Sequence, residues 1–482
     1  MKFYITTPIY YASGDPHIGH AFTTVYADVI SRYKKDKNFD VFFLTGMDEY
    51  GSKIAEKAKL AGKEPQKYVD EIAQKYVDLW KALRIENNDF IRTTSLRHKD
   101  GVLKFFEKLK AAGDIYSGDY EGLYCVGCED FILERKLVNG LCPDHQTKPE
   151  AVREKNYFFN FKKYSLQIKE KINSGELKII PESRKNEVLA ILNGDLPNFS
   201  ITREKVQWGI SYSFDKTQTI YVWIEALMNY VTALDFPDGE KFKKFWPVDV
   251  HIIGAEINKF HSLFWPALLM SAELLLPKKI FVHGLFTVNG QKMSKTLGNV
   301  IDPIKLANQF GADAVRYLLL SQFPATEHGD IKESEFGAKY NSDLANGIGN
   351  LFERTFVMAL KYGVDFKAVD AEIKKITAEI FKKYNENMEN FRLYEALREV
   401  FILVKFLDRY LNDKSPWTFY KNNPSNPEIA KILNSVIFGI EIIIKMLNYF
   451  MPDKMKDAEI FLNKLKSGDL KKNAKINLFP RV

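Results

Sequence analysis

Cysteine is scarce in this chain of 482 residues, which has only Cys125, Cys128 and Cys142. An odd and low number of cysteines argues against the disulfide framework of a secreted protein. Long apolar runs are also missing: the longest, such as 266–276, are interrupted and fall short of the roughly 20 residues that a membrane-spanning helix needs. The N-terminus has no apolar core followed by a small-residue cleavage site, so it does not match a signal peptide. These absences predict a soluble, cytoplasmic protein.

The sequence also has no internal repeat and no low-complexity tract, but its composition suits a large packed core. Hydrophobic residues make up 46% and charged residues 27%, with a mean hydropathy of -0.25, which excludes a disordered chain. The net charge is +7, and residues 341–482 contribute +5 of it, from 23 Lys/Arg against 18 Asp/Glu. This mild surplus is compatible with an RNA partner.

The pattern of apolar segments divides the chain into four parts. Strand-like and helical stretches alternate in residues 1–115 and again in 211–340, which predicts two halves of one parallel, doubly wound α/β sheet. Residues 116–210 differ in character and read as an insertion, while residues 341–482 show only amphipathic helices and predict an all-α bundle. The expected strands are 3–7, 41–45, 90–93, 219–222, 248–253 and 280–285. The expected helices are 18–34, 51–62, 66–83, 98–112, 224–234, 257–274, 342–361, 371–387, 392–411 and 427–448.

The first motif that carries chemistry is the segment DPHIGH, residues 15–20, directly after the first strand. Asp15 suits a helix N-cap and Pro16 the first helical position, so a helix should open here. His17 and His20 then share a face, and Gly19 lets a flat ligand approach the backbone. Free N–H groups at a helix start favour an anion. A capped helix with two surface histidines is the simpler alternative.

The second motif is KMSKT, residues 292–296, after the strand expected at 280–285 and a turn at Gly290. Lys292 and Lys295, with two hydroxyl groups, could hold a polyphosphate. Alone, an exposed basic turn would be the better interpretation, but the pairing with the first motif, in this order and separation, argues against it.

The third motif is C-x2-C-x13-C-x2-H, formed by Cys125, Cys128, Cys142 and His145. Two short pairs supply four sulfur and nitrogen ligands, the set that tetrahedral Zn²⁺ takes in closed structural sites. Such a site has no open position for chemistry, so we expect one structural zinc. Three buried small residues and an unrelated histidine are the alternative.

The first two motifs together match the signature pair of class I aminoacyl-tRNA synthetases. Four further segments make the chain resemble the methionyl-tRNA synthetase family: 7–11 (TPIYY), 44–51 (LTGMDEYG), 221–226 (YVWIEA) and 260–266 (FHSLFWP). The resemblance runs from residue 3 to residue 481. One departure is Thr296, where the family usually has serine; a hydroxyl is retained, so we expect little consequence.

The resemblance implies that methionine is activated with ATP and Mg²⁺ to methionyl-adenylate and then transferred to the 3′ end of tRNA(Met). It implies a Rossmann-like catalytic domain in two halves, 1–115 and 211–340, the second with the KMSKT loop and a stem-contact region. A zinc-knuckle insertion, 116–210, would split them, and a helical anticodon-binding domain, 341–482, would follow. A monomer is expected, since the oligomerisation module of some relatives is missing.

The resemblance also implies roles for individual residues. Asp48 would pair with the methionine ammonium, while the N–H of Ile9 and the hydroxyl of Tyr230 would face the thioether sulfur. Without the resemblance, most of the aromatic side chains implied for methionine binding would be interpreted as core residues. Trp417 would likewise be a core residue, and Asn350 and Arg354 would be ordinary surface residues. The implied ATP-binding residues are His17, Gly19, His20, Lys292, Ser294 and Lys295, with the histidines and lysines catalytic. The implied methionine-binding residues are Ile9, Tyr11, Asp48, Trp223, Ala226, Tyr230, Ile257, Phe260 and His261, and the anticodon-binding residues are Asn350, Arg354 and Trp417.

Other readings remain open. Small nucleotidyltransferases share an HxGH motif at a strand–helix junction but are much shorter. Synthetases for valine, isoleucine or leucine generally carry a far larger insertion. A non-catalytic RNA-binding or scaffolding relative would be expected to lose the signature histidines and lysines, which are all present here.

Overall fold

The structure is a computed structural model that describes residues 1–482 except 133, 144–145, 195, 294–298 and 472–473. It divides into two compact units, each described here by itself. Unit 1 holds residues 1–16, 34–81 and 86–284, and unit 2 holds residues 17–33, 82–85 and 285–482.

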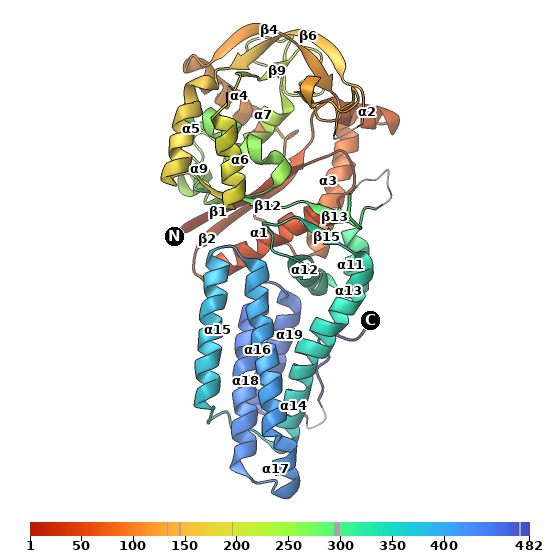
Figure 1. The fold of residues 1–482 in the computed structure, drawn as a ribbon, viewed down its shortest axis with the longest axis vertical. Helices are drawn as coiled ribbons and strands as arrows, with labels where there is room; N and C mark the ends of the chain where they lie inside the picture. The colour runs from red at the N-terminus through yellow and green to blue at the C-terminus, as the bar shows by residue number, and fades with distance from the viewer. Residues whose placement is uncertain (133, 144–145, 195, 294–298, 472–473) are drawn as a thin grey trace. The chain divides into compact units, whose positions relative to one another are not determined.

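Unit 1 is built on a six-stranded parallel sheet with the strand order β3-β2-β1-β11-β12-β7 (Figure 1). Its central strands are almost continuously apolar because helices cover both faces of a parallel sheet. The order reverses between β1 and β11, and open α/β sheets bind ligands at the carboxyl ends of strands at such a reversal. This sheet confirms the predicted α/β, doubly wound fold. The strands are β1 (Lys2–Tyr11), β2 (Asp40–Asp48), β3 (Asp89–Arg92), β7 (Lys178–Ile180), β11 (Val250–Gly254) and β12 (Lys279–His283).

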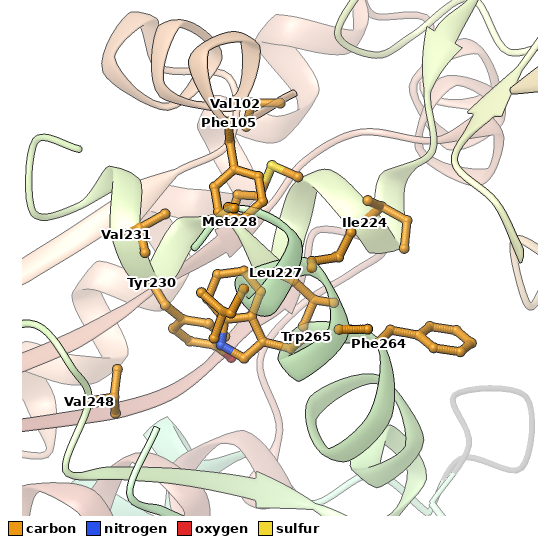
Figure 2. Packing of buried hydrophobic residues seen from close by; sticks show 14 of the residues in the cluster. Val102, Phe105, Ile224, Leu227, Met228, Tyr230, Val231, Val248, Phe264 and Trp265 are labelled. Carbon is orange, nitrogen blue, oxygen red and sulfur yellow. The ribbon is translucent and has the colours of Figure 1, made fainter. Parts of the chain in front are cut away.

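The core of unit 1 packs helices against this sheet. Trp265 is fully buried, and its ring centroid lies 6.0 Å from those of both Phe105 and Tyr230 (Figure 2). The same buried cluster includes Leu227 and Val248, so residues far apart in the sequence share one core. The helices of unit 1 are α2 (Ser52–Leu60), α3 (Pro65–Ala82), α4 (Leu96–Ala111), α5 (Lys162–Ser174), α6 (Glu182–Leu192), α7 (Val222–Leu227), α8 (Asn229–Thr232), α9 (Glu240–Phe245), η2 (Ala255–Ile257), the π-helix η3 (Phe260–Phe264) and α10 (Trp265–Ser271).

A second sheet carries the cysteine-rich segment. It is antiparallel, with the order β5-β4-β6-β8, and β4 pairs with β6 from Ile115↔Phe159 to Tyr124↔Glu150. The strands are β4 (Ile115–Cys125), β5 (Asp130–Ile132), β6 (Glu150–Phe159) and β8 (Phe199–Ser200), with the short helix η1 (Glu134–Lys136).

Several expected elements differ from the structure. The strand expected at 219–222 is wrong for the main sheet, because β10 (Thr219–Ile220) pairs antiparallel with β9 (Thr202–Arg203). The sixth strand of the main sheet is instead β7, which lies within the segment interpreted as an insertion and is too short to show a periodic pattern. The helix expected at 257–274 is divided among η2, η3 and α10, and the helix expected at 224–234 is interrupted at Met228.

Unit 2 contains a helical bundle, as predicted for the C-terminal part. Figure 1 shows α14, α15, α16, α18 and α19 side by side, with α18 contacting the other four. Side chains of Asp370 and Asn426 cap α15 and α18, which satisfies N–H groups at the helix starts. The helices are α1 (Ile18–Asp36, mostly in this unit), α11 (Pro303–Phe310), α12 (Ala312–Leu320), α13 (Glu333–Lys339), the π-helix η4 (Tyr340–Gly349), α14 (Asn350–Tyr362), α15 (Ala371–Glu389), α16 (Leu393–Lys414), α17 (Pro416–Asn422), α18 (Pro427–Leu447) and α19 (Pro452–Ser467). A small sheet has the order β14-β13-β15, with β13 (Phe286–Val288), β14 (Gln291–Lys292) and β15 (Gly329–Ile331).

Two features of the bundle differ from the expected helices. The helix expected at 342–361 begins as the π-helix η4 before α14, and Trp417, which lies between the helices expected at 392–411 and 427–448, belongs to the short helix α17. Over the described residues, no helix is both long and apolar enough to cross a membrane.

A buried ion pair lies inside unit 2. The Arg316 guanidinium, which has no exposed surface, contacts Asp28 Oδ2 at 2.7 Å. It also donates to the carbonyls of Leu83, Tyr449 and Phe450 at 2.9–3.1 Å. These carbonyls follow the ends of α3 and α18, where helices leave acceptors without intrahelical donors, so one side chain satisfies three of them.

Candidate functional site

The residues implied for methionine binding meet at the carboxyl edge of the main sheet. Tyr11 ends β1, Asp48 ends β2, and their Cα atoms are direct partners in the sheet. Ile9 lies two residues before Tyr11, and η2 with Ile257 follows β11. Parallel strands present their carboxyl ends at one edge, which brings these distant segments together.

Aromatic rings supply part of this edge. Trp223 of α7 and Phe260 of η3 stack, with ring centroids 4.4 Å apart and an interplanar angle of 11°. Both are half-buried, while Ala226, one turn after Trp223, is buried. Figure 2 shows Tyr230 among the buried residues around Trp265.

Tyr230 and His261 form a buried hydrogen-bonded pair. Nδ1 of His261 lies 3.0 Å from the carbonyl of Ile257, so this nitrogen carries the ring hydrogen and donates it. Nε2 must then accept, and the Tyr230 hydroxyl, 2.7 Å away, donates to it. Burial lowers the pKa of His261 to about 4, which agrees with a neutral ring. The sequence predicted a role for this hydroxyl as a donor to sulfur, yet its hydrogen is directed to His261.

Asp48 is a buried carboxylate with spare acceptor capacity. Only 6% of the residue is exposed, and its Oδ1 accepts no hydrogen bond from any residue that the structure describes. Burial raises the pKa of Asp48 well above the usual carboxyl range, and repulsion from Glu225 raises it further. A cation beside Asp48 would remove both penalties.

Glu225 belongs to a buried polar network that the sequence analysis did not identify. Its Oε2 lies 2.7 Å from Nε2 of His98, whose Nδ1 lies 2.8 Å from Thr232 Oγ1. Burial lowers the pKa of His98 to about 3 and raises the pKa of Glu225 well above the usual carboxyl range, so burial favours the uncharged form of each group. The sequence does contain one indication of this network. His98 lies four residues before Val102 in α4, so the two share the buried face of that helix, where a histidine needs polar partners.

The signature histidines lie at the start of α1, although the helix begins at Ile18 rather than at Pro16. Asp15 therefore does not cap it. The His17 and His20 rings stack at 3.7 Å, His20 Nδ1 accepts from His17 N, and His17 Nδ1 accepts from Gly19 N, both at 3.1 Å. The N–H of Ile18 donates to the carbonyl of Ile301. The expectation of free N–H groups here is wrong, because these three are already bonded.

The KMSKT motif begins beside these histidines. The Met293 methyl lies 3.4 Å from the position that a Cβ on Gly19 would occupy, and that Cβ would meet the His17 ring at 3.0 Å. A side chain at position 19 would therefore crowd the His17 ring, whereas its contact with Met293 would be an ordinary van der Waals contact. The Lys292 backbone pairs with Thr287. Ser294, Lys295 and Thr296 lie outside the described residues, as does the side chain of Lys292.

The three cysteines converge and could hold a metal ion. Their sulfur atoms all lie within 4.8 Å of one another, and those of Cys128 and Cys142 are 3.6 Å apart. Zinc–sulfur bonds of about 2.3 Å in a tetrahedron require sulfurs roughly 3.8 Å apart, so the arrangement fits. Cys125 and Cys142 are buried. His145, the expected fourth ligand, lies outside the described residues.

Two of the three residues implied for anticodon binding are neighbours. The Arg354 guanidinium lies 5.9 Å from the ring centroid of Trp417, and it is held by Asp408 Oδ1 at 3.0 Å and Asn412 Oδ1 at 2.9 Å. Trp417 is 37% exposed. Asn350 is exposed at the first position of the same helix as Arg354. The holding residues Asp408 and Asn412, on α16, were not predicted, because nothing local in the sequence marks them.

Comparison with known proteins shows the family to which the chain belongs. The family model described as tRNA synthetases class I (M) matches residues 3–149 and 145–356. Methionine–tRNA ligases of Thermotoga maritima and Caldanaerobacter subterraneus subsp. tengcongensis are 42% and 40% identical, covering 95% and 100% of this chain and 75% and 79% of the relatives. The Mycobacterium tuberculosis methionyl-tRNA synthetase in complex with methionyl-adenylate has a TM-score of 0.93 and 31% identity, with both chains fully covered. The chain therefore belongs to the methionyl-tRNA synthetases, a family of class I aminoacyl-tRNA synthetases.

Proposed function

We propose that this chain performs its ligase reaction by binding the methionine ammonium on Asp48. The observation that carries the proposal is the buried Asp48 Oδ1, which has no hydrogen-bond donor among the described residues. An ammonium would supply both the donor and the positive charge that this carboxylate needs. The solved relative with methionyl-adenylate supports a ligand of this kind.

The methionine side chain would lie against Trp223, Phe260 and Tyr230. Aromatic walls suit a long, polarizable thioether, because sulfur makes favourable contacts with ring edges. Since the Tyr230 hydrogen is directed to His261, the N–H of Ile9 is the better candidate as donor to the sulfur. Ala226, Ile257, Tyr11 and His261 would complete the pocket.

The chemistry needs no enzyme nucleophile. The methionine carboxylate attacks the α-phosphorus of ATP, a new O–P bond forms, and the bond to pyrophosphate breaks. The protein contributes positioning and stabilisation of the developing phosphate charge. We assign His17, Gly19 and His20 to ATP, and the KMSKT residues Lys292, Ser294 and Lys295 to the departing pyrophosphate, with Mg²⁺ on the phosphates.

Two further assignments follow from the chemistry of the donors. The sulfur cluster would hold one Zn²⁺ with Cys125, Cys128, Cys142 and His145, and the ion would supply a structural cross-link only. Asn350, Arg354 and Trp417 would read the anticodon of tRNA(Met): Trp417 offers a stacking face, and the other two offer hydrogen bonds to unpaired bases.

ATP–pyrophosphate exchange with a panel of amino acids tests the proposal. We expect exchange with methionine and little with valine, leucine or isoleucine. No exchange with any amino acid would favour either a nucleotidyltransferase that uses another acceptor or a non-catalytic relative. Binding of methionine to the Asp48→Asn protein with unchanged affinity would remove the assignment of the ammonium site.

A further inference from the structure

Glu129 is a buried carboxylate next to the sulfur cluster. It follows Cys128 directly, only 3% of it is exposed, and its φ of 51° places it in the left-handed region. A buried charged side chain in this backbone conformation requires specific partners.

Three donors surround this carboxylate, two of them from segments distant in the sequence. Oε1 accepts from the backbone N–H of Lys53 at 2.7 Å and from the Tyr11 hydroxyl at 3.2 Å. Oε2 accepts from the Tyr124 hydroxyl at 2.5 Å. Lys53 lies in the first turn of α2, where the helix dipole favours a negative charge. The carboxylate therefore joins three elements at one point.

The turn that carries Glu129 makes a second contact with the candidate pocket. The indole N–H of Trp223 donates to the carbonyl of Cys128 at 3.2 Å. Two consecutive residues thus hold two aromatic side chains implied for methionine binding: Glu129 holds Tyr11, and Cys128 holds Trp223.

Gly51 shows how closely these groups approach. A Cβ on Gly51 would lie 2.7 Å from both Glu129 Oε1 and the Tyr11 hydroxyl oxygen, closer than real contacts allow. Its φ of 108° also favours glycine. The contact between Tyr11 and Glu129 is therefore enclosed, with no room for a side chain between them and α2.

We propose that Glu129 is a positioning residue for methionine, which acts by fixing the phenol of Tyr11. The proposal rests on the proposed function in one respect, that Tyr11 lines the methionine pocket. Glu129 does not touch the reacting atoms. Its effect is on methionine affinity, while ATP binding and the rate of adenylate formation at saturating methionine stay nearly unchanged.

A double-mutant cycle with Tyr11→Phe tests this. The dissociation constant for methionine is measured by equilibrium dialysis for wild type, Glu129→Ala, Tyr11→Phe and the double variant. We expect Glu129→Ala to raise it roughly tenfold, the change that one hydrogen bond to a charged group makes. In the Tyr11→Phe background the same substitution should change it by less than about twofold, since the partner hydroxyl is already gone.

Two conservative variants separate positioning from folding. Glu129→Gln keeps an acceptor for Tyr11 and Lys53 and should bind methionine within about twofold of wild type. Glu129→Asp keeps the charge but withdraws the carboxylate by one methylene, so its affinity should fall as in Glu129→Ala. Zinc content is measured for the wild type and for each variant. If Glu129→Ala loses metal, Glu129→Asp takes its place in the double-mutant cycle with Tyr11→Phe.

Equal losses in both Tyr11 backgrounds, or unchanged methionine affinity in Glu129→Asp, would overturn the proposal. A large fall in the kcat of Glu129→Ala with an unchanged KM for methionine would also overturn the proposal. Failure of the proposed function is distinguishable, because the wild-type protein itself would then not bind methionine.

Discussion

The hydroxyl of Tyr230 donates its only hydrogen to Nε2 of His261, across 2.7 Å in the buried part of the candidate pocket. This direction holds only while His261 is neutral, since an imidazolium has no acceptor nitrogen. The pocket's polarity is therefore tied to the protonation state of one buried histidine.

Acid should weaken the fold through His261. Folded His261 stays neutral down to a pH of about 4, because burial lowers its pKa, whereas in the unfolded chain it protonates near 6.5. Between these values the unfolded state binds more protons, so the free energy of unfolding falls as pH falls, by up to about 3 kcal/mol. The thermal midpoint should drop between pH 6.5 and 4, and less steeply in His261→Gln. Parallel curves for the two proteins would contradict this.

Asp48→Asn should cripple methionine use. The variant keeps the shape of the side chain but removes the counter-charge for the ammonium, and breaking a buried pair costs about 3–5 kcal/mol. In ATP–pyrophosphate exchange, kcat/KM for methionine should fall roughly 10²- to 10⁴-fold. Asp40→Asn, at the exposed start of the same strand, is the matched control and should stay near wild type. A similar loss in both variants would mean that the strand, not the charge, is responsible.

Cys142→Ser should release the metal. One of three converging sulfurs would be replaced by a weaker ligand for a soft ion, while the six-stranded sheet stays folded. Metal analysis should give one zinc per wild-type chain and clearly less in the variant. Lys148→Ala, exposed near the cluster, should keep its zinc. A metal-free wild type prepared without chelators would refute the zinc assignment.

Trp417→Ala should impair aminoacylation without affecting activation. Base stacking on one aromatic side chain is worth about 1–3 kcal/mol, so kcat/KM for tRNA should fall roughly 5- to 150-fold. Exchange, which needs no tRNA, should be unchanged. Phe419→Ala is a close control, because Phe419 lies on the same short helix with the same exposure of 37%. If exchange falls in parallel with aminoacylation, Trp417 stabilises the fold instead.

Arg316→Leu should destabilise unit 2 by about 3–5 kcal/mol, because three buried carbonyls lose their donor and Asp28, which also contacts Arg32, loses one of its cationic partners. Asp28→Leu removes the carboxylate that Arg316 shares with Arg32, so if Arg316 and Asp28 act together the double variant should lose less stability than the sum of the two single losses. Thermal unfolding of the two single variants and the double variant measures the coupling. Additive losses would show that the pair does not act as a unit.

Sequence patterns predicted those features of the protein that lie within one short segment of the chain. The parallel sheet was predictable because its long strands alternate with helices, and the cysteines were found because they fall within 18 consecutive residues. The three residues of β7 were missed because so short a strand has no period to detect.

Contacts between distant residues could not be predicted. Glu129 meets Tyr11 from 118 residues away, and His98 meets Glu225 from 127 residues away, so no sequence window contains both partners. The irregular η3 was predicted as an ordinary helix because the periods of a π-helix and an α-helix differ little over five residues.

The ion pair between Asp28 and Arg316 has a consequence for how this protein can evolve. Arg316 serves four acceptors at once, and no other side chain offers five donors in a fixed fork. A single substitution at Arg316 removes the donor of three carbonyls, and one at Asp28 removes the carboxylate that both Arg316 and Arg32 contact. The three residues are therefore expected to change together: related sequences should keep Asp28, Arg32 and Arg316 or exchange them as a set, and a chimaera that joins Asp28 to a foreign residue at position 316 should be less stable.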